Sequence, residues 1–115
     1  MYTTNLKNAK LLDLPGRAVR VFIGTHQLDS DHMTMGMTEV APRTDMTPHV
    51  HEDKEELIFI IQGHGETVIG DTTEKLEPFT AVKFPIGIPH VVKNQSDEVM
   101  RFVFCFSPPN DFGKK

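Results

Sequence analysis

The sequence predicts an all-β domain with the architecture of a small antiparallel barrel or sandwich. Eight glycines and eight prolines are spread over 115 residues, so a helix of average length fits in only a few places. The segments between them are short and rich in Val, Ile, Thr and Phe, which favour strands. Short strands separated by regular turns are typical of sandwiches and barrels.

Seven runs are expected to form strands. They cover residues 17–23, 33–40, 57–62, 66–69, 80–84, 90–93 and 99–106. Between two short β-runs, Gly70-Asp71 has the length and composition of a two-residue hairpin loop. The run 52–62 could also be considered as a helix, but its β-branched residues and its end at Gly63 favour a buried strand.

Two of the expected strands carry large apolar residues at alternate positions, which places them on one face of each strand. These stripes are Met33, Met35 and Met37 in the first strand and Phe102, Phe104 and Phe106 in the second. We expect the methionines to face the core and the phenylalanines to lie in a core or an interface. Cys105 is flanked by phenylalanines and is expected to be an inert, buried thiol.

The length of the chain is that of one domain. We expect an N-terminal arm over residues 1–16, a barrel over 17–107 and a C-terminal tail over 108–115. A single cysteine excludes an intramolecular disulfide, which suits a reducing cytoplasm.

The charge of the chain argues against two classes of partner. Twelve basic and sixteen acidic residues give a net charge of -4, which disfavours a nucleic-acid backbone or an anionic membrane. No stretch approaches 18 apolar residues, and the first residues lack the layout of a signal peptide. We therefore expect a cytoplasmic protein that binds a small molecule or another protein.

The histidines at 49 and 51 form the first part of a candidate metal site. Side chains at i and i+2 project from the same face of a strand, whereas on a helix they diverge. Glu56 follows His51 by five residues, and His90 follows a turn rich in proline and glycine. Three imidazoles and one carboxylate form a ligand set suited to one divalent transition metal, such as iron, manganese, zinc, nickel or cobalt.

These residues resemble the two sequence motifs of the cupins. His49, His51, Glu56 and Gly63 match the pattern H-x-H-x3-4-E-x6-G. The second pattern, P-x-G-x2-H-x3-N, is matched by Pro85, Gly87, His90 and Asn94. The resemblance implies a small antiparallel double-stranded β-helix, the cupin or jelly-roll barrel, with His49, His51, Glu56 and His90 directed at one metal ion.

The sequence offers a second glutamate for the first motif and lacks the glycine that opens each motif. Glu55 also fits the spacing of the first motif, but Glu56 preserves the six-residue gap to Gly63 and is preferred. The glycines that open the two motifs are replaced by Arg43 and Phe79, so the departures concern turns and not the ligands.

The other histidines, His26, His32 and His64, lie in expected loops and are interpreted as solvated side chains. No catalytic residue is assigned from the sequence. The leading hypothesis is a metal-dependent enzyme that acts on a small organic molecule by Lewis-acid isomerase, lyase or hydrolase chemistry or by dioxygenase chemistry. The alternative is a non-catalytic protein that binds a sugar or another small molecule.

A structural metal is the weakest of the hypotheses, because structural zinc sites are usually rich in cysteine. We also expect a homodimer. The resemblance implies pairing through the barrel sheets and the N-terminal arm, and an isolated barrel of this size has exposed edge strands.

Overall fold

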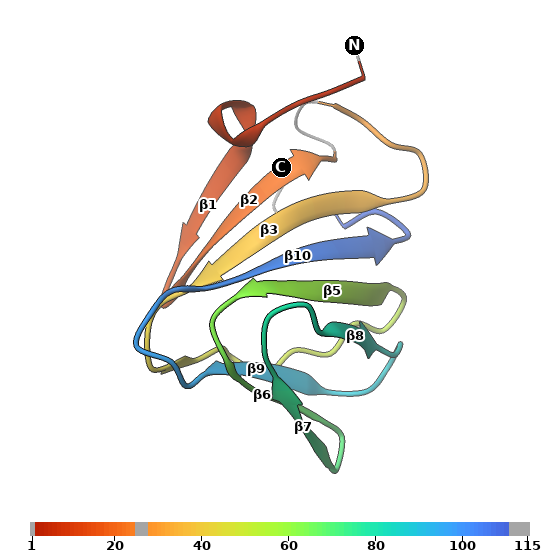
Figure 1. Ribbon diagram of the computed structural model, residues 1–115. Coiled ribbons are helices and arrows are strands. Elements are labelled where there is room, and N and C mark those ends of the chain that lie inside the picture. The colour runs from red at the N-terminus through yellow and green to blue at the C-terminus, as the bar shows by residue number, and fades with distance from the viewer. Residues whose placement is uncertain (1, 25–27, 111–115) are drawn as a thin grey trace.

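The computed structural model describes residues 2–24 and 28–110 and consists mainly of strands (Figure 1). One short 3-10 helix, η1 (Leu6–Asn8), precedes them. The strands are β1 (Lys10–Leu14), β2 (Arg17–Ile23), β3 (Thr34–Val40), β4 (Thr44–Asp45), β5 (Glu55–Gln62), β6 (Gly65–Ile69), β7 (Thr72–Leu76), β8 (Ala81–Phe84), β9 (His90–Asn94) and β10 (Met100–Ser107).

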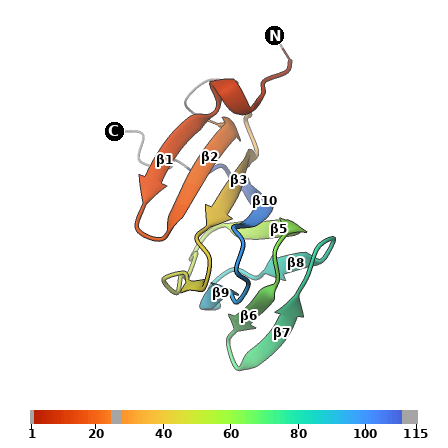
Figure 2. The same cartoon turned by 60° about the vertical axis from the view of Figure 1, so that its left-hand side comes forward.

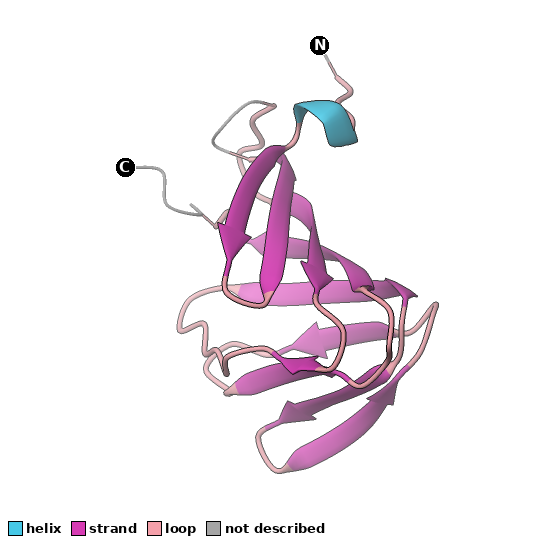
Figure 3. Ribbon diagram, turned by 90° about the vertical axis from the view of Figure 1, so that its left-hand side faces the viewer, coloured by secondary structure: helices cyan, strands magenta, loops and turns pink. Residues whose placement is uncertain are grey.

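The strands form two antiparallel sheets. The large sheet has the order β1-β2-β3-β10-β5-β8, and the small sheet has the order β4-β9-β6-β7. Figures 2 and 3 show the large sheet lying over the small one, with the β1–β2 hairpin at one end of the molecule and the β6–β7 hairpin at the other. The predicted all-β, antiparallel jelly-roll fold is confirmed.

The strand predictions agree with the structure in position, with small differences at the ends. The predicted hairpin is present, since Ile69 pairs with Thr72 and Gly70 takes a φ of +57°. Residues 10–14, within the segment expected as an arm, form β1 and pair with β2 along their whole length. Of the expected tail, residues 111–115 lie outside the described residues, as does His26.

The core lies between the two sheets, and the phenylalanine stripe of β10 faces it as predicted. The prediction for the methionine stripe was wrong. Met33 and Met35 are exposed, and the opposite face of β3, with Thr34 and Gly36, is buried. The cause is the neighbouring strand: Phe104 pairs with Gly36, and a Cβ at Gly36 would overlap the Phe104 ring.

The same alternation corrects two further expectations. Cys105 lies on the outer face of the large sheet and is only partly buried. β5 is buried on one face only, because Ile58 and Ile60 point into the core whereas Leu57 and Phe59 are exposed.

Both positions at which the cupin motifs expect glycine keep a glycine-like backbone. Arg43 has a φ of +53° and Phe79 a φ of +70°, in the left-handed region that a side chain disfavours. The departures in sequence therefore leave the turns in place, at a cost of about 1–2 kcal/mol at each residue.

This strain predicts that glycine at position 79 gives a more stable protein than alanine does. We expect Phe79→Gly to have a free energy of unfolding about 1 kcal/mol higher than Phe79→Ala, because both remove the mostly exposed ring and only glycine relieves the strain. Urea unfolding of the two variants measures the difference. An alanine variant as stable as the glycine variant would contradict a strained turn.

Candidate metal centre

A cavity of about 210 Å³ lies between the two sheets. Most of its wall is apolar, with Val19 and Phe104 from the large sheet and Val92 from the small sheet. Four ionisable side chains of the predicted site, His49, His51, Glu56 and His90, also line it.

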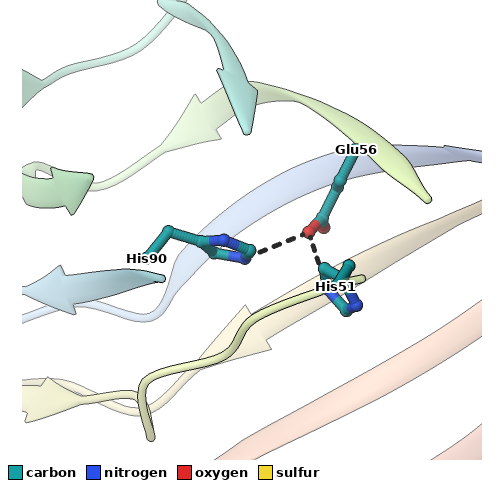
Figure 4. A group of neighbouring side chains, drawn as sticks. All are labelled: His51, Glu56 and His90. Atoms are coloured by element: carbon teal, nitrogen blue, oxygen red, sulfur yellow. Dashed lines mark ion pairs between the residues drawn. The ribbon is translucent and has the colours of Figure 1, made fainter. Parts of the chain in front are cut away.

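Three of the predicted ligands converge (Figure 4). The Nε2 atoms of His51 and His90 each lie 3.5 Å from Oε1 of Glu56. One ligand atom from each residue lies within 4.8 Å of those of the other two. The side chains of Glu56 and His90 are buried and that of His51 is half-buried, so the cluster is largely shielded from solvent.

Backbone hydrogen bonds bring the two motifs together. The N–H of His49 donates to the carbonyl of His90 and the N–H of His90 donates to the carbonyl of His49, both at 2.8 Å. The N–H of Gly87 donates to the carbonyl of His51, and Gly87 has a φ of +77° that favours glycine. The turn before β9 is therefore attached to the segment that carries the histidine pair.

The imidazole of His90 is held on two sides. The Phe84 ring stacks on it, with centroids 4.0 Å apart and planes 8° from parallel. Its Nδ1 lies 3.4 Å from the carbonyl of Ile88, which can only accept a hydrogen bond. With the proton on Nδ1, Nε2 presents a lone pair that can bind a metal, whereas in the metal-free protein a proton on Nε2 can be donated to Glu56.

The alternation of β5 separates the two candidate glutamates. Glu56 is 8% exposed and faces the cavity, whereas Glu55 points outward and lies 3.5 Å from Nζ of Lys83. Burial alone would raise the pKa of Glu56, but its contacts with His51 and His90 outweigh burial and hold the pKa below the ordinary value. Glu56 therefore stays an anion inside the protein.

His49 lies beside this cluster. Its ring centroid is 6.1 Å from that of His51 and 6.3 Å from that of His90, whereas the latter two are 5.3 Å apart. Burial, and next the positive charge of Arg17, hold the pKa of His49 below its ordinary value. The structure thus brings three of the four predicted ligands together and places the fourth in the same cavity wall.

The convergent atoms fit a divalent transition metal. Two ligand atoms that each lie about 2.1 Å from a shared ion, at angles near tetrahedral, are roughly 3.4 Å apart. The two distances of 3.5 Å between imidazole nitrogen and carboxylate oxygen match this separation. An anionic carboxylate with neutral imidazoles is also the donor chemistry that such ions prefer.

Two residues have roles that the sequence motifs do not predict. Asn94, the last residue of the second motif, is absent from the cavity wall and donates hydrogen bonds to the carbonyls of Val40, Ala41 and Glu98. Arg17 lines the cavity and was not predicted there, although alternation along β2 places it on the face of Val19. Outside the cavity, His32 and His64 are exposed, as expected.

Comparison with known proteins supports the assignment of the fold. The family model described as "Cupin domain" matches residues 36–106. A polyketide synthase, CurC, from Streptomyces cyaneus is 30% identical over 74 residues, which are 64% of this chain and 48% of that protein. The chain therefore spans about half the length of this curated relative.

Solved structures are similar over almost the whole chain. The polyketide cyclase RemF from Streptomyces resistomycificus is 26% identical, with a TM-score of 0.78 over 93% of this chain and 79% of that one. KdgF from Halomonas sp. is 19% identical, with a TM-score of 0.81 over 97% and 96% of the two chains. In the described part of the chain, no helix is long and apolar enough to cross a membrane.

Proposed function

The chain belongs to the cupin family, and on this premise we propose that it is an enzyme that uses one divalent transition metal to act on a small organic molecule. The observation that carries the proposal is the convergence of His51, Glu56 and His90 in the wall of a mostly apolar cavity. We propose that these three residues hold the ion and that His49 supplies a fourth ligand after rotation of its ring.

A metal held in this way supplies Lewis acidity toward a carbonyl or carboxylate oxygen. The protein side chains do the rest. Glu56 offsets part of the ionic charge, and Phe84 and the carbonyl of Ile88 fix the ring of His90. The apolar wall excludes water and orients the carbon skeleton of the ligand.

The names of two relatives favour carbonyl substrates. One is called a polyketide synthase and the other a polyketide cyclase, and a polyketide carries repeated carbonyl groups. We propose that the reaction begins with transfer of a proton from the carbon next to a carbonyl to a solvent water, which leaves an enolate, a step that Lewis acidity would promote. Isomerase, lyase and ring-forming chemistry can all start in this way.

Deuterium exchange into pyruvate tests this proposal. We expect the Zn²⁺-loaded protein to accelerate exchange of the methyl protons in D₂O, measured by NMR, and the metal-free protein to leave the rate at that of buffer. Binding of both metal and pyruvate without any acceleration would contradict this enzymatic step and support the alternative of a protein that only binds a small molecule.

We also propose a homodimer that forms through the outer face of the large sheet rather than through the N-terminal arm. Apolar side chains lie side by side there, since Cys105 pairs with Met35 on one side and with Leu57 on the other. Two residues away on β10, and on the same face, Val103 pairs with Met37 on one side and with Phe59 on the other. Monomers rarely expose a continuous apolar patch of this kind, which supports pairing of two copies.

A pair of matched substitutions tests the interface. Leu57 is 50% exposed on this face and Leu6 is 51% exposed in η1, so a lysine at either site replaces a similar apolar surface. We expect wild type and Leu6→Lys to have about twice the 13.0 kDa chain mass in light scattering, and Leu57→Lys to be a monomer. Dissociation by Leu6→Lys alone would instead place the interface at the N-terminal arm.

A further inference from the structure

We propose that Arg17 binds an anionic group of the ligand, so that the cavity selects a small, largely apolar molecule with one carboxylate. The inference rests on the proposed function, because it describes the ligand of the same cavity. It adds a residue that lies outside both cupin motifs and a chemical class for the ligand.

The position of Arg17 follows from the strand that carries it. Arg17 begins β2 and pairs with Val40, and alternation puts its side chain on the inner face with Val19. It is half-buried and lines the cavity together with His49. The same cavity wall includes the cluster of His51, Glu56 and His90, so Arg17 and the proposed metal ligands share one cavity.

Arg17 differs from the other arginines in having no ion-pair partner among the described residues. Arg20, Arg43 and Arg101 each have Nε 2.8 Å from a carboxylate oxygen. Within residues 2–24 and 28–110, no carboxylate lies within ion-pair distance of Arg17 and its side chain makes no hydrogen bond to protein. A half-buried guanidinium that no described residue pairs offers a fork of N–H donors that fits a carboxylate.

The charges of the cavity also favour an anion. Among the described residues that line it, Glu56 is the carboxylate and Arg17 the permanent cation, and the other ionisable groups are imidazoles. With a divalent ion bound, the cavity carries a net positive charge within an apolar wall. A buried charge of this kind is stabilised by a partner of opposite sign, which a carboxylate ligand provides.

The size of the cavity limits the rest of the ligand. An apolar cavity of about 150 Å³ holds one benzene molecule. The 210 Å³ measured here therefore has room for about one ring or a short branched chain together with a carboxylate. Larger substrates would have to extend through the mouth of the cavity.

Benzoate and benzamide test the inference, because they have the same shape and differ in charge. We expect the Zn²⁺-loaded wild type to bind benzoate at least about tenfold more tightly than benzamide in a calorimetric or NMR titration. Arg17→Gln should weaken benzoate binding about tenfold and change benzamide binding less than about twofold. Arg17→Lys keeps the charge and should recover part of the lost affinity.

Arg20→Gln is the matched control. It removes the same charge from the same strand, but Arg20 lies on the outer face, and its partner Glu39 keeps its ion pair with Arg101. We expect this variant to bind both probes as the wild type does. An equal loss of benzoate and benzamide in Arg17→Gln, or no loss at all, would overturn the inference.

The same titrations without metal separate this inference from the proposed function. If the protein fails to bind Zn²⁺, the proposed function fails, whereas the metal-free arm still measures the effect of Arg17 on benzoate. If Zn²⁺ binds and Arg17→Gln has no selective effect on benzoate, the inference fails and the metal site stands. Thermal unfolding of each variant confirms that the titrated protein is folded.

Discussion

Replacing His51 with alanine is expected to weaken Zn²⁺ binding by at least about 100-fold. Loss of an outer-shell partner alone typically costs 10–100-fold in metal affinity, and His51→Ala removes a direct ligand. It also removes one of the two imidazoles that lie 3.5 Å from the Glu56 carboxylate. Competition with a chromophoric chelator at pH 7.5 measures the affinity.

His64→Ala is the control for this substitution, since His64 is exposed and lies outside the cavity wall. Its affinity for Zn²⁺ should equal that of the wild type. His49→Ala completes the series, and we expect a loss of at least about tenfold, because His49 is proposed as the fourth ligand. Wild-type affinity in His51→Ala would contradict the assignment of the centre.

Asn94→Ala is expected to lower the free energy of unfolding by about 3–5 kcal/mol, which is large for one substitution. Asn94 is 1% exposed, and its Nδ2 lies 2.9–3.1 Å from the carbonyls of Val40, Ala41 and Glu98. Alanine would remove this donor from the buried carbonyl of Val40 and from the partly buried contacts with Ala41 and Glu98. Urea unfolding monitored by circular dichroism measures the loss.

The acceptor side of Asn94 adds to this effect. Its Oδ1 accepts hydrogen bonds from the N–H and the hydroxyl of Ser96, at 2.9 and 2.6 Å. Asn94→Asp keeps the acceptor but loses the donor, so we expect it to be destabilised as well. Asn8→Ala, at an exposed position in η1, should change the stability by less than about 0.5 kcal/mol. A stable Asn94→Ala variant would contradict the buried network.

The fold could be predicted because short β-rich runs and turn residues mark strands locally. Which face of a strand is buried is a different question. In β3 the methionine face is more apolar, yet Phe104 of β10 needs the space above Gly36 and turns the methionines outward. In β5 both faces are apolar, so its alternation could not be predicted from hydrophobicity. Such orientations depend on strands that are distant in sequence.

The candidate site could be predicted only in part, because sequence spacing marks its residues but does not determine their packing. The spacing of His51, Glu56 and His90 identified the residues that the structure brings together. The separation of His49 from them depends on side-chain geometry, which spacing alone does not determine. Arg17 precedes both motifs, and only the packing of β2 against the rest of the barrel places it in the cavity.

Anomalous scattering from crystals grown with Zn²⁺ tests most directly whether His51, Glu56 and His90 hold one metal ion. We expect one strong peak per chain, about 2.0–2.2 Å from Nε2 of His51, Oε1 of Glu56 and Nε2 of His90. The position of the His49 ring relative to that peak decides whether it is the fourth ligand. Anomalous peaks confined to exposed histidines such as His32 and His64, with none in the cavity, would contradict this assignment.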